Sequence, residues 1–189
     1  MTKKNIRKLF LDKRASISER DQAIAQDLLL IRFQDMTFEN LSMVHTYLPI
    51  VQKKEPDPGP LLRFLEFRFP GIQFSIPRTD LINGTMTHWK FDEHTILRED
   101  LNGIPEPQNG NMIDIREIDL VIVPLLAFDH RGFRVGYGKG FYDRFLPECR
   151  KNAIRLGLSF FDAVDHIDDI EEYDIPLHYC VTPDRIHEF

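Results

Sequence analysis

The most constraining feature of this sequence is the stretch over residues 119–146, where an apolar run leads into a glycine-rich loop. Residues 120–126 read LVIVPLL, a nearly continuous apolar run without a polar face. Such a run is typical of a strand that is covered on both sides, as in a parallel sheet between layers of helices. The pattern therefore predicts a strand over 120–126 whose hydrogen-bond ladder ends at Pro124, then a loop, then a helix over 140–150.

The rest of the chain alternates between helical and strand patterns. Helices are predicted where apolar residues recur every three or four positions, and Ser18 with Asp21 forms a weak capping box at the start of the second one. Helices are expected over 3–14, 18–33 and from Pro60 to Phe69, strands over 43–48, 72–76, 85–91, 120–126, 153–158 and 179–181, and loops over 55–60 and 102–112. We therefore expect one α/β domain over residues 1–189, Rossmann-like, with three αβα layers and a mostly parallel sheet. Ligands of such sheets bind at the carboxyl ends of the strands.

Composition excludes several classes of protein. The net charge is −6, from 24 basic and 30 acidic residues, which does not favour a general nucleic-acid-binding surface. Cys149 and Cys180 lack CxxC spacing, so a disulfide framework and a cysteine-rich zinc site are excluded. No apolar run approaches the roughly 20 residues that span a bilayer, and the basic N-terminal stretch lacks the apolar segment of a secretory signal. We expect a cytoplasmic protein that binds neither membranes nor nucleic acid.

The sequence Gly-Tyr-Gly-Lys-Gly over residues 136–140 is a candidate phosphate site. Its glycines allow the backbone N–H groups to approach an anion, a helix follows, and Arg134 and Lys139 add positive charge. It matches neither a Walker A loop nor the GxGxxG dinucleotide motif. Asp143 is placed to hold a Mg²⁺ ion that bridges phosphate oxygens. Two alternatives remain open here: a tight turn without a ligand, and an Asp143 that only faces the helix N-terminus.

The segment FDHRGFRVGYGKGFYDRFL, residues 128–146, closely resembles the signature of the 5-formyltetrahydrofolate cyclo-ligase family, also called the 5,10-methenyltetrahydrofolate synthetases. The resemblance extends over most of the chain. Shorter matches follow in the family's order at Lys3 and Arg7, at Tyr47-Leu48-Pro49 with Glu55, at Phe74-Ser75-Ile76-Pro77-Arg78, and at Gly103-Ile104-Pro105-Glu106-Pro107. The long segment is specific, whereas the shorter matches carry weight through their order.

The resemblance implies a three-layer α/β fold and a defined reaction. Members of this family convert 5-formyltetrahydrofolate to 5,10-methenyltetrahydrofolate, using ATP and Mg²⁺ and releasing ADP and phosphate. An N-formyl group is a poor electrophile, and phosphorylation of its oxygen creates a leaving group before N10 attacks the carbon. The protein must then align the formyl oxygen with the γ-phosphate and neutralise charge there.

The resemblance also implies a role for particular residues. Lys139 and Arg134 are the expected catalytic residues. The residues expected to bind ATP are Lys3, Arg7, Arg134, Val135, Gly136, Tyr137, Gly138, Lys139, Gly140, Phe141 and Tyr142. Those expected to bind the reduced folate are Leu48, Glu55, Tyr137, Gly138, Lys139, Gly140 and Phe141, and Asp143 and Asp174 are the expected Mg²⁺ ligands. Trp89 and Met86 are expected in the core rather than in the folate pocket.

Three departures from the family pattern stand out. Phe141 replaces a tyrosine of many relatives, two extra residues separate Leu48 from Glu55, and His178 occupies a position that is often aspartate. The acidic segment 162–174 is expected to be a solvated face in which only Asp174 is functional.

Simpler interpretations of the other charged residues are a solvated basic helix for Lys3 and Arg7 and a surface acid for Glu55. Two other functions remain as alternatives: another phosphate-handling α/β enzyme, and a folate- or nucleotide-binding module without turnover. The protein is expected to be a monomer.

Overall fold

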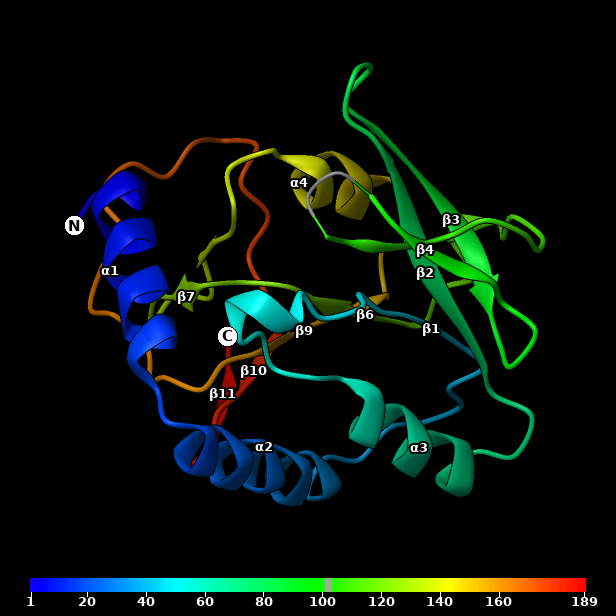
Figure 1. Cartoon of the computed structure of the whole chain (residues 1–189), viewed down its shortest axis with the longest axis horizontal. Coiled ribbons are helices and arrows are strands. Elements are labelled where there is room, and N and C mark those ends of the chain that lie inside the picture. Colours follow the sequence, from blue (N-terminus) through cyan, green and yellow to red (C-terminus); the bar gives the residue numbers. More distant parts are fainter. Residues whose placement is uncertain (101–102) are drawn as a thin grey trace.

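The chain folds around a seven-stranded sheet with helices on both sides (Figure 1), and the computed structural model describes residues 1–100 and 103–189. The helices are α1 (Lys3–Ser16), α2 (Glu19–Gln34), α3 (Gly59–Arg68) and α4 (Phe141–Phe145), with single 3₁₀ turns at η1 (Val51–Lys53), η2 (Ile115–Glu117) and η3 (Leu146–Glu148). The strands are β1 (Met43–His45), β2 (Gln73–Asp80), β3 (Thr85–Phe91), β4 (Leu97–Glu99), β5 (Pro105–Pro107), β6 (Leu120–Val123), β7 (Ala127–Phe128), β8 (Arg134–Val135), β9 (Ile154–Leu158), β10 (Tyr179–Val181) and β11 (Ile186–Glu188).

The strand order of the main sheet is β11-β10-β9-β6-β1-β2-β3. The five inner strands of this sheet, β10, β9, β6, β1 and β2, pair parallel with one another. The edge strands β3 and β11 pair antiparallel with their neighbours. Val44 of β1 lies opposite Phe74 of β2 on one side and Leu120 of β6 on the other. The chain first builds outward from β1 to β2 and β3 and later returns to the opposite side at β6. In open α/β sheets, such a reversal between neighbouring strands opens a crevice at their carboxyl ends.

The core has the three layers that the pattern predicts. Leu29 and Phe33 of α2, with the leucines of α3, pack on one face of the sheet. Phe145 of α4 packs on the opposite face, against Val121 and Val123 of β6. Figure 1 shows this arrangement, with α2 and α3 below the sheet and α4 above it. The mostly parallel α/β architecture is therefore confirmed.

The third apolar cluster joins α1 to the two-stranded ladder of β7 and β8. Ile6 and Phe10 of α1 are buried against Ala127 and Val135. This packing places the N-terminal helix beside the loop that follows β8, although the two are more than a hundred residues apart in sequence. Arg134 lies opposite Phe128 in the same ladder, so its backbone position is set by strand pairing.

Several predicted boundaries are confirmed, and others are wrong, one of them because of a proline within a strand. Ser18 caps α2 by accepting from the N–H of Asp21 at 3.0 Å, and β6 ends directly before Pro124. The strand expected at 72–76 instead continues through Pro77 to Asp80. Along β2, the backbone N–H and C=O groups of alternate residues point away from β3, toward β1. Ser75 is one of these residues, because its carbonyl accepts from the backbone N–H of Thr46. Pro77, two residues later, has the same backbone orientation and lies beyond the last residue of β1. The N–H that proline lacks would therefore have no partner strand, so the sheet loses no hydrogen bond there.

Other expected elements are shorter or different. β1 ends at His45 rather than at residue 48, and the expected helix over 140–150 is helical only through Phe145. Pro147 follows within a 3₁₀ turn, because its ring and missing N–H do not fit a helix interior. The stretch expected as a loop over 102–112 contains β5, which pairs with β4, whereas its Asn102 lies outside the described residues.

Two further predictions concern the cysteines and membrane spans. Cys149 and Cys180 are both free thiols buried in the core, as expected from their spacing. Among the helices of the described chain, none combines the length and apolar character that a transmembrane segment needs.

Candidate functional site

A cavity of about 600 Å³ opens where β1 and β6 end. Tyr47 and Leu48, which follow β1, and Pro124, which follows β6, form part of its wall. Every residue to which the sequence assigned a role lines this one cavity. These residues are Lys3, Arg7, Leu48, Glu55, Arg134, Val135, Gly136, Tyr137, Gly138, Lys139, Gly140, Phe141, Tyr142, Asp143 and Asp174. The structure thus brings together residues from both ends and the middle of the chain, at the crevice expected for this topology.

The opposite wall comes from the hairpin of β2 and β3, which the sequence did not assign to the site. Leu81 and Gly84 at the hairpin tip, together with Met86 of β3, line the cavity. Met86 was expected in the core, and it does pack against a core cluster, but it also faces the cavity. Trp89 is absent from the described lining, but the prediction that it lies in the core is wrong, because it is only partly buried and belongs to none of the apolar core clusters of the described residues. Its indole N–H donates to Thr87.

The glycine-rich loop runs between β8 and α4 and has the backbone conformation that its sequence requires. Gly138 and Gly140 adopt φ values of +86° and +69°, in the left-handed region that favours glycine. A Cβ atom on Gly138 would lie 3.1 Å from the Arg7 guanidinium, so a larger residue would push this cation away. The following helix α4 has only five residues, and its dipole is therefore a smaller source of positive potential than the sequence suggested.

Positive charge at the loop comes mainly from side chains. Arg7 donates from Nε to the carbonyl of Gly136 at 2.9 Å, which ties α1 to the loop. Arg134 is buried, and this burial lowers the pKa of its guanidinium while the neighbouring Asp143 opposes the shift. Lys139 is exposed and lines the same cavity. These cations line the same cavity as the glycines, so they would neutralise an anionic ligand bound there.

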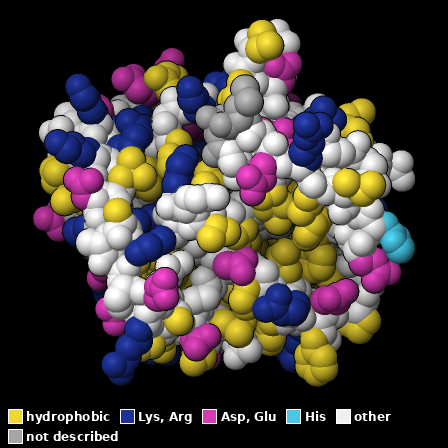
Figure 2. Space-filling view, in the orientation of Figure 1, with side chains coloured by type: hydrophobic (Ala, Val, Ile, Leu, Met, Phe, Trp, Pro, Cys, Tyr) yellow, Lys and Arg dark blue, Asp and Glu magenta, His cyan; other side chains and the backbone are white. Residues whose placement is uncertain are grey.

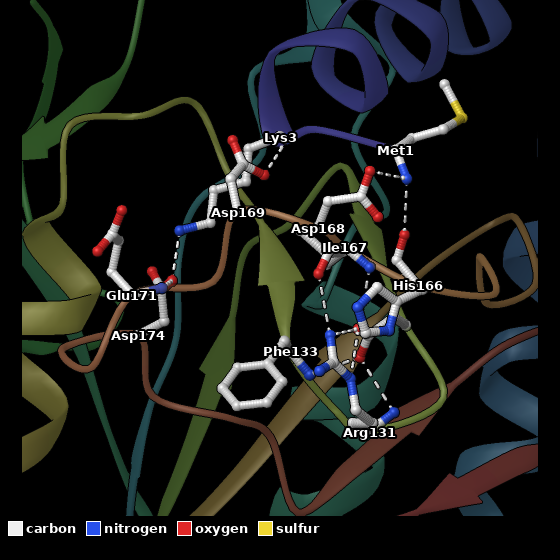
Figure 3. Close-up of polar contacts among 11 residues, drawn as sticks. Met1, Lys3, Arg131, Phe133, His166, Ile167, Asp168, Asp169, Glu171 and Asp174 are labelled. Carbon is white, nitrogen blue, oxygen red and sulfur yellow. Dashed lines mark hydrogen bonds and ion pairs between the residues drawn. The ribbon is translucent and has the colours of Figure 1, made fainter.

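Both candidate metal ligands are engaged in ion pairs. Asp143 accepts from Arg134 Nη2 at 2.7 Å, and Asp174 accepts a short hydrogen bond from Lys3 Nζ. Asp174 also accepts from the N–H of Glu171 at 2.7 Å (Figure 3). In the described part of the chain, no group of three or more His, Cys, Asp and Glu side chains gathers into a complete metal site. Two carboxylates in one cavity nevertheless fit Mg²⁺, which usually completes its shell with phosphate oxygens and water.

The carboxylates that precede Asp174 in the acidic segment are exposed, as expected, and two of them also contact the start of the chain and of α1. Asp169 accepts from the backbone N–H of Lys3 at 2.6 Å, and Asp168 lies 2.9 Å from the amino group of Met1. Figure 3 shows these contacts converging on the start of α1. The segment therefore anchors the helix that carries Lys3 and Arg7 to the cavity. Figure 2 shows basic side chains, interspersed with acidic ones, over the side of the molecule where α1 lies.

At the other end of the cavity, Glu55 is buried with several hydrogen-bond partners. Its side chain accepts from the Tyr137 hydroxyl at 2.5 Å and from the N–H of Ile50 at 2.7 Å. Burial, followed by the negative charge of Glu55, raises the pKa of Tyr137, so this phenol stays protonated and remains a donor. Residues 51–53, between Leu48 and Glu55, form η1, and the Glu55 carboxylate lines the cavity. It is therefore not a surface acid.

The sequence did not single out two cations at this end. Arg14 lies 3.9 Å from Glu55, and Lys53 lies 4.4 Å from the centre of the Tyr137 ring. The available signal for Arg14 was its position seven residues after Arg7, on the same face of α1. Lys53 belongs to a short turn and had no such signal.

The other two positions that depart from the family pattern, Phe141 and His178, lie in different parts of the structure. Phe141 lines the cavity, and its ring lies 5.3 Å from the Arg144 guanidinium. His178 contacts Arg155 and is absent from the described lining of the cavity. Of these two positions, Phe141 therefore falls within the candidate site, as does the segment between Leu48 and Glu55.

Comparison with known proteins places the chain in a family. Residues 1–183 match the model of the 5-formyltetrahydrofolate cyclo-ligase family. A 5-formyltetrahydrofolate cyclo-ligase of Mycoplasma genitalium is 29% identical over 194 residues, covering 94% of this chain and 97% of that protein. The Escherichia coli K12 protein of the same name is 35% identical over 86 residues, which is 45% of this chain and 47% of the relative.

Solved structures agree with this assignment. The NMR structure of Aquifex aeolicus 5,10-methenyltetrahydrofolate synthetase is 26% identical and superposes with a TM-score of 0.81, covering 100% of this chain and 93% of that one. A 5,10-methenyltetrahydrofolate synthetase from Mycoplasma pneumoniae, 21% identical, shares the fold with a TM-score of 0.76 over 97% of this chain and 99% of that one. The chain therefore belongs to the 5-formyltetrahydrofolate cyclo-ligase family and is a ligase.

Proposed function

We propose that this protein catalyses the ATP- and Mg²⁺-dependent cyclisation of 5-formyltetrahydrofolate to 5,10-methenyltetrahydrofolate, with release of ADP and phosphate. The observation that carries the proposal is that every residue expected to bind ATP, folate or Mg²⁺ lines one cavity at the switch point of the sheet. The cavity has basic side chains around a glycine loop at one end and a buried carboxylate at the other. This polarity suits a substrate pair made of a triphosphate and a pterin.

The phosphate end is proposed to hold ATP. Lys3, Arg7, Arg134 and Lys139 neutralise the phosphate oxygens, and the backbone around Gly138 approaches them closely. When bound, Mg²⁺ supplies positive charge shared between phosphate oxygens, and Asp143 with Asp174 would hold it. These carboxylates are also the partners of Arg134 and Lys3, so a bound Mg²⁺ would share them with these ion pairs.

The folate end is proposed to orient the pterin. Glu55 accepts hydrogen bonds from ring N–H donors, while Leu48 and Phe141 cover apolar parts of the substrate. This orientation brings the formyl oxygen in line with the γ-phosphate, which is the main contribution that a protein makes to phosphoryl transfer. Tyr137 lines the cavity and is hydrogen-bonded to Glu55, so it connects the two ends of the site.

The proposed chemistry has two steps. The formyl oxygen attacks the γ-phosphorus, the bond to the ADP oxygen breaks, and an O-phosphorylated formyl group forms with positive charge at N5. N10 then attacks the formyl carbon, loses its proton, and expels phosphate to leave the methenyl bridge. Lys139 and Arg134 stabilise the charge on the transferring phosphoryl group.

The test is the absorbance of the methenyl product, with purified protein, 5-formyltetrahydrofolate, Mg²⁺ and ATP. An absorbance increase that requires ATP and stops when Mg²⁺ is chelated supports the proposal. If both ligands bind by calorimetry but no product forms, the protein is the non-catalytic binding module, for which Phe141 would be a natural site of lost function. If ATP hydrolysis proceeds without folate, the protein is another phosphate-handling enzyme.

The remaining expectations are part of the same proposal. We expect a monomeric cytoplasmic enzyme whose partners are ATP and the reduced folate, with no nucleic acid and no membrane. The mixed charges on the face drawn in Figure 2 agree with this expectation, because nucleic-acid binding usually needs a continuous basic surface. Sedimentation at micromolar concentration tests the monomer.

A further inference from the structure

Helix α1 presents three basic residues to the cavity region from one face. Lys3, Arg7 and Arg14 are separated by four and seven residues, so they follow one another along the helix. Lys3 contacts Asp174 and Arg7 contacts the glycine loop, and the proposed function uses both at the phosphate end. Arg14 lies on the final turn of α1, far from those contacts along the helix, and has no role so far.

Arg14 is buried and has partners on two sides. Its side chain is 3% exposed, which is unusual for an arginine. Nη2 donates a short hydrogen bond to the carbonyl of Leu125, just after β6. Nη1 points to the other end of the cavity, 3.4 Å from the Tyr137 hydroxyl and 3.9 Å from Glu55 Oε1. One guanidinium thus connects the end of a central strand with both polar groups of the folate end.

The contacts around Tyr137 define the direction of its hydroxyl group. Its single O–H is donated to Glu55 at 2.5 Å, so its lone pairs are left to accept from Arg14. The second Glu55 oxygen accepts from the Ile50 N–H. With both oxygens held, the carboxylate has a fixed orientation, and its remaining lone pairs are available to a ligand.

The segment that carries Glu55 is also attached to the end of α1. Lys54 donates from Nζ to the carbonyl of Ala15 at 3.1 Å and to that of Ile17 at 2.5 Å. These bonds hold the turn before Glu55 against the residues that follow Arg14. The end of α1 and residues 50–55 therefore form one connected unit at the folate end of the cavity.

We propose that Arg14 is a positioning residue for folate binding, which acts through Glu55 and Tyr137 and makes no contact with the substrate. The proposal rests on the function proposed above. A buried carboxylate without a compensating cation is costly, and a guanidinium with several donors can hold it in one orientation. Arg14 supplies this charge from behind the cavity wall, since it is not among the described residues that line the cavity.

The experiment compares ligand affinities of Arg14→Gln and Arg14→Lys, measured by titration calorimetry with 5-formyltetrahydrofolate alone and with Mg²⁺-ATP alone. Arg14→Gln is expected to raise the Kd for the folate by about 10-fold or more, the effect of losing a charge-assisted hydrogen bond. The Kd for Mg²⁺-ATP should stay within about twofold. Arg14→Lys keeps the charge without the forked geometry and should restore part of the folate affinity. It also serves as the folded variant if Arg14→Gln is unstable.

Two comparisons separate positioning from a merely structural role. Lys8→Gln removes an exposed cation from the same helix and should bind folate as the native protein does. In a Glu55→Gln background, Arg14→Gln should weaken folate binding by much less than it does in the native protein, because its target is already changed.

The proposal is overturned by any one of three results. These are a folate Kd within twofold of the native value in the folded Arg14 variants, an equal loss of affinity for both ligands, or full additivity with Glu55→Gln. A native protein that binds 5-formyltetrahydrofolate but forms no methenyl product contradicts the proposed reaction only, since the affinity comparison still tests Arg14. A native protein that does not bind the folate contradicts the proposed function itself.

Discussion

His88 provides a quantitative test of the packing beneath the glycine loop. Its ring is 7% exposed and stacks on Phe145 of α4, with the ring centres 4.0 Å apart. The ring centre of His45 lies 4.8 Å from that of His88 and 5.0 Å from that of Phe145, so the three rings form one cluster. Burial lowers the pKa of His88 from its ordinary 6.5 to about 4, and burial followed by the charge of His88 lowers the pKa of His45. Both histidines are therefore neutral at pH 7 in the folded protein.

The direction of the pH effect follows from these pKa values. Because the pKa of His88 is lower in the folded chain, the unfolded chain binds more protons between pH 6.5 and about 4. The contribution of neutral His88 to the free energy of unfolding is fully present above this window and is lost as the pH falls through it. Between pH 7 and pH 5, His88 alone accounts for a loss of about 2 kcal/mol in the free energy of unfolding.

The assay is urea unfolding of the native protein and of His88→Gln at pH 7, 6 and 5. The variant will be less stable at pH 7, since the stacking on Phe145 changes, but its stability should fall by about 2 kcal/mol less on acidification. His94→Gln is the matched control, because that side chain is 86% exposed and its replacement should leave the pH dependence unchanged. If the native protein and His88→Gln lose the same free energy between pH 7 and pH 5, His88 is not buried and neutral as described.

Three other substitutions test the site and the core. Lys139→Ala should lower kcat by about 100-fold or more through loss of a charge contact to the transferring phosphoryl group, and near-native turnover in a folded variant refutes this role. Asp143→Asn should raise the Mg²⁺ concentration needed for half-maximal ATP binding in calorimetry, and an unchanged Mg²⁺ titration removes Asp143 from the metal site. Gly157→Ala should destabilise the protein by about 1–3 kcal/mol in urea unfolding, because the new Cβ would lie 2.5 Å from Leu125 and 2.8 Å from Leu177. Native stability in this last variant would mean that β9 and its neighbours shift freely.

The sequence predicted the parts of the fold that depend on local patterns. The apolar run of β6 and the periodic apolar residues of α1 each carry their own signal, as does the Ser18 cap of α2. The short ladders were not predictable in the same way. β7 and β8 have two residues each, and they exist because Ala127 and Phe128 find partners beyond a turn. A pattern of two residues cannot be distinguished from a loop.

The site could be predicted where the motif is continuous, and less well where it depends on distant contacts. Residues 134–143 form one segment, so their common position was expected. The pairing of Lys3 with Asp174 joins residues that are 171 positions apart, and no local pattern indicates that contact. Arg14 shows the same difficulty, because its spacing from Arg7 was visible but its partner Glu55 was not. The anchoring role of Asp169 likewise required the position of α1.

The central claim, that the cavity activates the formyl oxygen by phosphoryl transfer, has a direct test. 5-Formyltetrahydrofolate labelled with ¹⁸O in the formyl group is converted with unlabelled ATP, and the released phosphate is analysed by mass spectrometry. The proposed reaction transfers the formyl oxygen to phosphorus, so each phosphate should carry one ¹⁸O atom for each methenyl product formed. Methenyl product accompanied by unlabelled phosphate would show that the oxygen leaves by another route, and would contradict the claim.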